Sequence, residues 1–323
     1  MESIILSHQD VVSLLGEQEI LNGVETVFRE QGRNAVDEPG KIALDLTTAG
    51  GRGLATITCA HLSAQKAAGI KMAGNFPGNS AKGMPKTMST IILFDPETGA
   101  TRCIMDGRYI TIGRTGAMAA IAAGYLISNP AILGVFGAGD VGRAVIRYFC
   151  ASFRLKEIRV FDTSPSMARN AVAKIDDRQS SRIRTAENPT DCLDGADVIV
   201  TATTADSPLF AANQVGKNAV VITLGSNPEL PEELVLQASF RVVDLLASHR
   251  QRGDFGRFLS TGRLTDSDIH ADLGQIVAGS SPLHQQEGWT VAALLGMGAL
   301  DVCLAQKVYA AALEKGRGVR FEF

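Results

Sequence analysis

The first third of the chain changes from a helical to a strand-like hydrophobic pattern. Within residues 10–30, apolar side chains recur every three to four positions, which is the spacing of one face of an amphipathic helix. Short runs rich in Ile, Leu and Thr follow, separated by Gly, Asn and Pro clusters, at 41–46, 54–59, 69–74 and 89–95. The pattern predicts a helix and then a meandering, mainly antiparallel sheet.

From about residue 114 the pattern changes again. An Ala-rich helical segment is followed by strand-like runs that alternate with helix-like ones, namely ILGVFG, IRVFD, VIVTAT, AVVITLG and RVVD. Such alternation predicts a parallel sheet with crossover helices. Residues 291–316 are again predicted as a helical segment, which ends in Lys-Gly like a C-cap and could return to the first domain.

Composition and charge narrow the class of protein. The 323 residues are enough for two hydrophobic cores, and 45% hydrophobic with 20% charged residues is typical of a globular α/β protein. A formal net charge of −3 provides no basic field for a phosphate backbone, so we expect no nucleic-acid partner.

Cysteines, histidines and the N-terminal sequence indicate neither metal nor membrane. The five cysteines are an odd number without a CxxC pair, and the five histidines lack HxxxH or HExxH spacing, so no disulfide framework or metal site is expected. No signal peptide is evident, and no stretch approaches the ~18–20 apolar residues that span a bilayer. We therefore expect a cytoplasmic protein without membrane contact.

The most specific motif is a glycine loop between an apolar strand and a helix. It comprises Gly137, Ala138, Gly139, Asp140, Val141 and Gly142. In such a GxGxxG turn the first glycine permits the tight turn, the second lets a pyrophosphate approach, and the third lets helix and strand pack closely. The N-terminus of the helix then offers free N–H groups to phosphates. The sequence context favours a dinucleotide site over a turn without ligand.

An acidic residue and several strand ends extend this site. Asp162 closes the next strand, where a carboxylate accepts hydrogen bonds from the adenosine ribose and repels a 2′-phosphate, so NAD is favoured over NADP. The alternative is a simple turn residue. Other strands end at Thr201, Thr203, Thr204 and at Gly225, Ser226, Asn227, and these groups should line the cofactor crevice unless the threonines are only ordinary strand formers.

Three basic residues are candidates for the part of the site that binds the substrate and carries out the reaction. Lys71 stands inside an apolar strand pattern, where burial would lower its pKa, although a solvent-facing lysine is the alternative. Arg114 precedes the Ala-rich helix and could bind a carboxylate bidentately, or it could be a surface arginine. Lys41 opens a strand and by itself fits a solvated side chain.

Several motifs in order resemble the ornithine cyclodeaminase/μ-crystallin family over nearly the whole chain. They are GIKMAGNFPGN, ILFDPETGATRCIMDGRYITIGRTGAMAAIAA, VFGAGDVGR, VTATTADSPLF, HADLGQIVAG and GMGALDV. The resemblance implies an α/β fold in which a Rossmann domain, residues 115–302, is inserted in a discontinuous α+β substrate-binding and dimerisation domain, residues 1–114 plus 303–323. It also implies a homodimer formed through the sheet of that second domain.

The resemblance assigns roles to individual residues. Those matching Lys71 and Arg114 contact the substrate carboxylate and reacting centre, and Lys41 matches a position that is commonly an arginine with the same task. Thr115, Gly225 and the backbone near Thr203 and Leu224 match or adjoin cofactor contacts.

Two departures from the family pattern bear on the reaction. Cyclodeaminases carry an aspartate where this chain has Asn227, and an amide cannot take up a proton. Thr58-Cys59-Ala60-His61 also replaces a Met-Pro-Ala-Tyr type sequence. We therefore expect an NAD(H)-dependent oxidoreductase acting at the α-carbon of a small amino or imino acid. The alternatives are a cyclodeaminase that uses NAD internally and a non-catalytic μ-crystallin-like binding protein.

Overall fold

The chain divides into two compact units. The structure, a computed structural model, describes residues 2–48, 53–175, 182–281 and 287–322. Unit 1 comprises Met1–Arg114 and Met297–Phe323, and unit 2 comprises Thr115–Gly296, so unit 2 is inserted into unit 1. The predicted boundary after residue 302 falls inside helix α12 (Gly298–Glu314). The structure keeps that whole helix in unit 1 because it packs along the sheet there.

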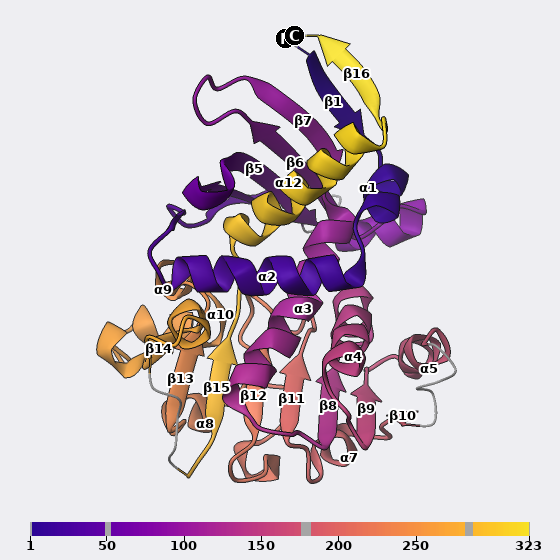
Figure 1. Cartoon of the computed structure of the whole chain (residues 1–323). Coiled ribbons are helices and arrows are strands. Elements are labelled where there is room, and N and C mark those ends of the chain that lie inside the picture. Colours follow the sequence, from indigo (N-terminus) through magenta and orange to yellow (C-terminus); the bar gives the residue numbers. More distant parts are fainter. Residues whose placement is uncertain (1, 49–52, 176–181, 282–286, 323) are drawn as a thin grey trace. The chain divides into compact units, whose positions relative to one another are not determined.

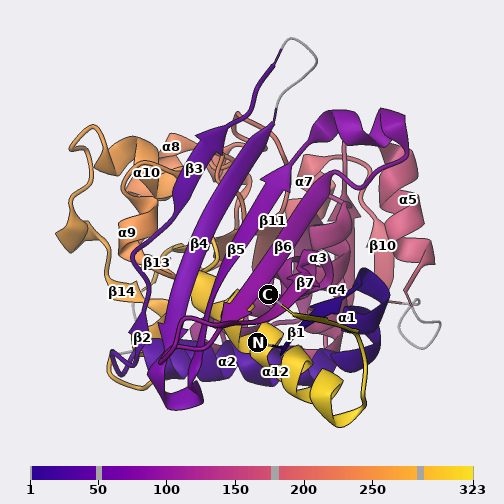
Figure 2. The same cartoon turned by 90° about the horizontal axis from the view of Figure 1, so that it is seen from above.

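Unit 1 is built on one eight-stranded sheet (Figure 2). The strand order is β16-β1-β7-β6-β5-β4-β2, with β3 also paired to β4, and every pair is antiparallel except β1 with β7. The bounds are β1 Glu2–Leu6, β2 Val36–Asp37, β3 Ile42–Asp45, β4 Leu54–Leu62, β5 Ala67–Asn75, β6 Thr87–Phe94, β7 Thr101–Asp106 and β16 Val319–Glu322. The predicted meandering, mainly antiparallel sheet is therefore found.

Helices cover one face of this sheet. Helix α12 packs along β4, β5 and β6, and α2 (Glu17–Gln31) packs on α12. The single helix predicted over 10–30 is wrong, because the chain forms α1 (His8–Leu14) and α2 with a break at Gly16. Gly16 is the N-cap of α2, and its N–H donates to the Glu19 carboxylate at 2.7 Å. Short 3₁₀ helices η1 (Ser63–Gln65) and η2 (Pro77–Lys82) complete the unit.

Unit 2 contains an eight-stranded sheet in which all pairs are parallel (Figure 1). The order is β10-β9-β8-β11-β12-β15-β13-β14, so the chain reverses direction across the sheet between β8 and β11. The bounds are β8 Ile132–Phe136, β9 Glu157–Phe161, β10 Ile183–Thr185, β11 Val198–Thr201, β12 Val220–Thr223, β13 Phe240–Val243, β14 Ala271–Asp272 and β15 Thr290–Ala293. This arrangement confirms the predicted Rossmann-type sheet.

Crossover helices connect these strands. They are α4 Asp140–Ser152, α5 Pro165–Ala173, α7 Pro189–Leu193, α8 Glu232–Leu236, α9 Leu246–His249, α10 Gly253–Leu259 and α11 Leu273–Val277, with η3 Ala212–Gln214 and η4 Asp266–Asp268. The Ala-rich helix α3 spans Arg108–Leu126, so Arg114 lies within it, and the prediction that Arg114 precedes this helix is wrong. No described helix is both long and apolar enough to cross a membrane.

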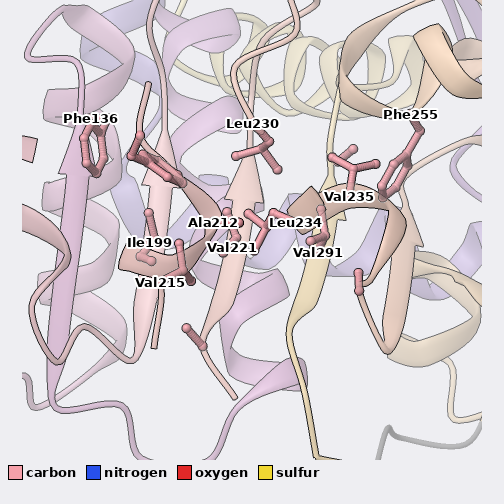
Figure 3. Packing of buried hydrophobic residues seen from close by; sticks show 14 of the residues in the cluster. Phe136, Ile199, Ala212, Val215, Val221, Leu230, Leu234, Val235, Phe255 and Val291 are labelled. Carbon is pink, nitrogen blue, oxygen red and sulfur yellow. The ribbon is translucent and has the colours of Figure 1, made fainter. Parts of the chain in front are cut away.

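The buried core of unit 2 explains one error of the sequence analysis. Apolar side chains from the strands and covering helices interdigitate, among them Phe136, Ile199, Leu230 and Phe255 (Figure 3). Residues 291–293, the start of the predicted helical segment 291–316, instead belong to β15 (Thr290–Ala293) between β12 and β13, and Val291 to Ala293 are fully buried. A continuous apolar run of this length does not distinguish a central strand from a buried helix.

Candidate functional site

Lys71 lies on the covered face of the sheet of unit 1. It is only 3% exposed, whereas its neighbours Ile70 and Met72 on β5 are 36% and 50% exposed. Side chains alternate between the faces of a strand, so Lys71 points toward α12 and its neighbours point away. The solvent-facing alternative for this lysine is therefore wrong.

The partner of Lys71 is Asp301 on α12. The Lys71 ammonium donates a hydrogen bond to Oδ2 of Asp301, and Arg114 Nε donates to Oδ1 at 3.3 Å. The Asp301 side chain is fully buried, and Arg114 is 6% exposed, so Arg114 is not a surface arginine. We call these three residues the Lys71–Asp301–Arg114 cluster.

Burial and charge set the protonation of this cluster. Burial lowers the pKa of Lys71 to about 7, with Arg114 adding to the effect and Asp301 opposing it. Burial disfavours the ionised Asp301, but Arg114 and Lys71 outweigh it and hold the pKa of Asp301 below its usual value. The cluster thus contains a carboxylate, a permanent cation, and an amine able to exchange a proton near neutral pH.

Two further residues border the cluster. Thr58 on β4 stands opposite Lys71 in the strand register and is 3% exposed, and its hydroxyl has no hydrogen-bond partner among the described residues. Lys41 is half-buried, and its charge contributes to lowering the pKa of Lys71. The expected role of Lys41 at the substrate carboxylate stays a prediction.

The glycine loop of unit 2 has the geometry that a dinucleotide requires. Gly137 has φ +97°, and a Cβ on Gly142 would overlap the carbonyl oxygen of Gly137. A Cβ on Gly139 would meet nothing within 4 Å, so open space lies in front of this residue. Gly139 is also the N-cap of the 13-residue helix α4 and provides no side-chain cap. The first N–H groups of α4 therefore suit a phosphate.

Asp162 follows β9, beside this loop. One carboxylate oxygen accepts the N–H of Ala138 at 2.8 Å, and the other accepts the N–H of Ser164 at 2.8 Å. Asp162 is half-buried. It therefore anchors the glycine loop, a role that the sequence analysis did not foresee, and a carboxylate has further lone pairs for ribose hydroxyls.

The other predicted residues of unit 2 lie at the carboxyl ends of strands. Thr203 follows β11, and Leu224 and Gly225 follow β12, with the Leu224 N–H donating to the Thr201 carbonyl at 3.0 Å. Thr115, at the start of the unit, is 7% exposed. Asn227 is exposed, and its amide donates to the Thr204 carbonyl at 3.4 Å.

The sequence analysis did not single out the buried carboxyl groups. They include Asp301 of unit 1 and Glu229 of unit 2, and Asp244 and Asp254 of unit 2 are fully buried as well. The sequence did contain a signal for Asp301, because it stands within the apolar helical pattern of 298–314. An acidic residue is rarely buried without a partner. Across the described ranges, no group of three or more His, Cys, Asp or Glu side chains is arranged to hold a metal.

The chain is similar over nearly its whole length to proteins of known name. The chain is 31% identical over 329 residues to the alanine dehydrogenase of Archaeoglobus fulgidus, covering 100% of this chain and 99% of the relative. It superposes with a TM-score of 0.90 on an archaeal alanine dehydrogenase dimer with bound NAD, at 30% identity and 100% coverage of both chains. It also superposes, at 0.90 and 26% identity, on Thermococcus litoralis Δ1-pyrroline-2-carboxylate reductase in complex with NADH and L-proline, covering 98% of this chain and 99% of that one. The model of the ornithine cyclodeaminase/mu-crystallin family matches residues 1–316, and the protein belongs to that family.

Proposed function

We propose that the protein is an NAD(H)-dependent oxidoreductase that acts at the α-carbon of a small amino or imino acid. The observation that carries the proposal is the buried Lys71–Asp301–Arg114 cluster, which combines a carboxylate-binding guanidinium with an amine whose pKa lies near 7. The similar proteins are an alanine dehydrogenase and a pyrroline-2-carboxylate reductase, and both reactions change the α-carbon of an amino acid.

The residues of unit 2 fit NAD as the cofactor. Gly137, Gly139 and Gly142 would cradle the pyrophosphate at the N-terminus of α4, and Asp162 would accept the adenosine ribose hydroxyls. Thr115, Thr203, Leu224 and Gly225 are proposed further contacts. A carboxylate at residue 162 disfavours the 2′-phosphate of NADP. When bound, the nicotinamide supplies the hydride acceptor or donor.

The residues of unit 1 would hold the substrate. Arg114 pairs with the substrate carboxylate through N–H groups that Asp301 does not use, and Lys41 adds a second cation. Asp301 is a positioning residue, because it fixes both Lys71 and Arg114 from one buried carboxylate. Lysine at position 41 retains the charge of an arginine but not its bidentate geometry.

Lys71 is proposed as the group that exchanges the proton. In the oxidative direction an L-amino acid and NAD⁺ give a 2-imino acid, NADH and one proton, which the neutral amine of Lys71 takes from the substrate nitrogen. In the reductive direction the Lys71 ammonium returns that proton to the nitrogen. Its pKa of about 7 makes both forms available at neutral pH. Asn227 cannot take this role, since an amide does not accept a proton there.

The test is a screen of amino acids with NAD⁺ and of cyclic and linear imino acids with NADH, followed at 340 nm. Stoichiometric formation or loss of NADH supports the proposal. Ammonia release without a net change in NADH would instead identify a cyclodeaminase. Ligand binding without either change would identify a binding protein, and both results would contradict the proposal.

We also propose that the protein is a homodimer. The face of the unit 1 sheet opposite α12 carries exposed apolar side chains on adjacent strands, and the register aligns Ile42, Ile57 and Met72 in one row. These three are 66%, 37% and 50% exposed, and Leu44 and Ile70 extend the patch. An apolar patch of this kind typically marks a protein interface. Light scattering should give twice the mass of one chain, and Met72→Glu should reduce it.

A further inference from the structure

Glu229 is a buried carboxyl group that the proposed mechanism does not use. It lies between β12 and α8, and its side chain is fully buried. Oε2 accepts the Thr201 hydroxyl at 2.7 Å, and Oε1 accepts both the Thr203 N–H at 2.9 Å and the Thr203 hydroxyl. Glu229 therefore fixes the segment that leaves β11 to the segment that leaves β12.

Within the described part of unit 2, no Lys or Arg side chain forms an ion pair with Glu229. The group beside it is a second buried acid, Asp254 on α10, whose Oδ1 accepts the Leu230 N–H at 2.7 Å and which is attracted by Arg257 of the same helix. Burial raises the pKa of Glu229 to about 7, Asp254 adds to that rise, and the threonine hydrogen bonds oppose it.

Glu229 lies at the strand ends toward which the nicotinamide half of the dinucleotide is expected to extend. This step rests on the proposed function. Asp162 after β9 would hold the adenosine ribose, and the glycine loop after β8 would hold the pyrophosphate. The nicotinamide half then extends toward the carboxyl ends of β11 and β12, on the other side of the reversal in strand order. Glu229 lies under these two strand ends.

We propose that Glu229 selects the redox state of the bound coenzyme, its carboxylate favouring NAD⁺ over NADH. The nicotinamide ring carries a positive charge in NAD⁺ and none in NADH, because hydride transfer adds two electrons and one proton to the ring. A fixed negative charge in a buried, poorly screened position attracts only the oxidised ring. The adenosine and pyrophosphate contacts are common to both forms and do not discriminate between them.

Hydrogen bonding alone does not require a charge at this position. A glutamine would accept the Thr203 N–H equally well, and it would avoid the desolvation of a carboxylate. The preference for NAD⁺ should therefore follow the ionisation of Glu229. As pH falls through about 7, the carboxyl group is protonated and the affinity for NAD⁺ should weaken relative to that for NADH.

The experiment measures the dissociation constants of NAD⁺ and NADH by calorimetry at pH 8.5 and pH 6. For the wild-type protein we expect the ratio Kd(NAD⁺)/Kd(NADH) to rise about 3- to 10-fold between these values. Glu229→Gln should show the higher ratio at both pH values, and Glu229→Asp, which keeps the charge, should retain the pH dependence. The matched control is Glu232→Gln, because Glu232 is exposed and paired with Arg263. It should leave the ratio unchanged.

The outcomes separate this inference from the proposed function. A purely structural role of Glu229 would change both constants together and leave their ratio constant, and this result would overturn the inference. So would a wild-type ratio that does not depend on pH, whether or not the glutamine variant folds. If the wild-type protein binds neither dinucleotide, the proposed function itself is wrong.

Discussion

Asp301 accepts a hydrogen bond from Lys71, 230 positions earlier in the chain. The contact joins α12 to β5, and it places two opposite charges where neither is accessible to water. Breaking such a buried pair from one side is destabilising, because the remaining charge is left without compensation.

We therefore expect Asp301→Asn to destabilise the protein. The variant removes the carboxylate, which leaves the Arg114 cation buried without its counter-charge and lowers the pKa of Lys71 further, so the loss should be about 3–5 kcal/mol. Urea unfolding measures it. Glu25→Gln, which removes a partly exposed pair with Arg29, is the control and should cost less than about 1 kcal/mol. An Asp301→Asn protein as stable as the wild type would show that the pair contributes no net stability.

Local patterns allowed a correct prediction of much of the fold. The strands at 54–59 and 69–74 and the glycine loop at 137–142 depend on residues close in sequence, and all were found. Asp301 could not be paired with Lys71 from the sequence, because only the packing of α12 on the sheet brings them together. The hydrogen bonds that Glu229 accepts likewise come from Thr201 and Thr203, which are 28 and 26 positions earlier in the chain.

Changing Lys71 tests the proton transfer. Lys71→Met keeps approximate length and should lower kcat by roughly 10²–10⁴ with a smaller effect on KM. Since the neutral amine accepts the proton in oxidation, wild-type activity should rise with pH through about 7 and then level off, and the reductive rate should fall over the same range. Lys86→Met, an exposed lysine of the same unit, is the control. Near-normal kcat in Lys71→Met would leave Lys71 only a binding role.

Two substitutions in the glycine loop test dinucleotide binding and stability separately. Gly139→Val should abolish dinucleotide binding without lowering the melting temperature, because its φ is −70° and a Cβ there meets no protein atom. Gly142→Ala should instead lower the melting temperature, since its Cβ would overlap the Gly137 carbonyl. Fluorescence titration with NADH and a thermal melt of each variant provide the check. Unchanged NADH affinity in Gly139→Val would place the cofactor elsewhere.

The raised pKa of Glu229 predicts that the stability of the protein depends on pH. This pKa is raised from 4.5 in the unfolded chain to about 7 in the folded protein, so the folded state binds the proton more tightly. Stability should fall by a few kcal/mol as pH rises from about 4.5 to 7. Glu229→Gln removes this contribution and should flatten the curve in that window. Denaturant unfolding at pH 5, 6, 7 and 8 measures the free energy of unfolding of both proteins. If it changes equally with pH in the wild type and in Glu229→Gln, the raised pKa of Glu229 is contradicted.

The last prediction concerns the choice of cofactor, which depends on Asp162. Its carboxylate has two roles, since it anchors the Ala138 N–H and would bind the ribose while repelling a 2′-phosphate. Asp162→Ser should weaken NAD binding about 10- to 100-fold, the range of a lost hydrogen bond to a charged group, and weaken NADP binding less.

Asp162→Asn distinguishes the two roles, because its amide oxygen can still accept the Ala138 N–H, while the charge and the acceptor of the Ser164 N–H are removed. If charge repulsion sets the preference, Asp162→Asn should gain affinity for NADP with little change in the glycine loop. If anchoring dominates, Asp162→Ser should lose affinity for both cofactors and Asp162→Asn for neither. Titration of both variants with NADH and NADPH measures this. Equal or tighter binding of NADPH by the wild-type protein would refute the preference, because the unmodified carboxylate would then not exclude the 2′-phosphate.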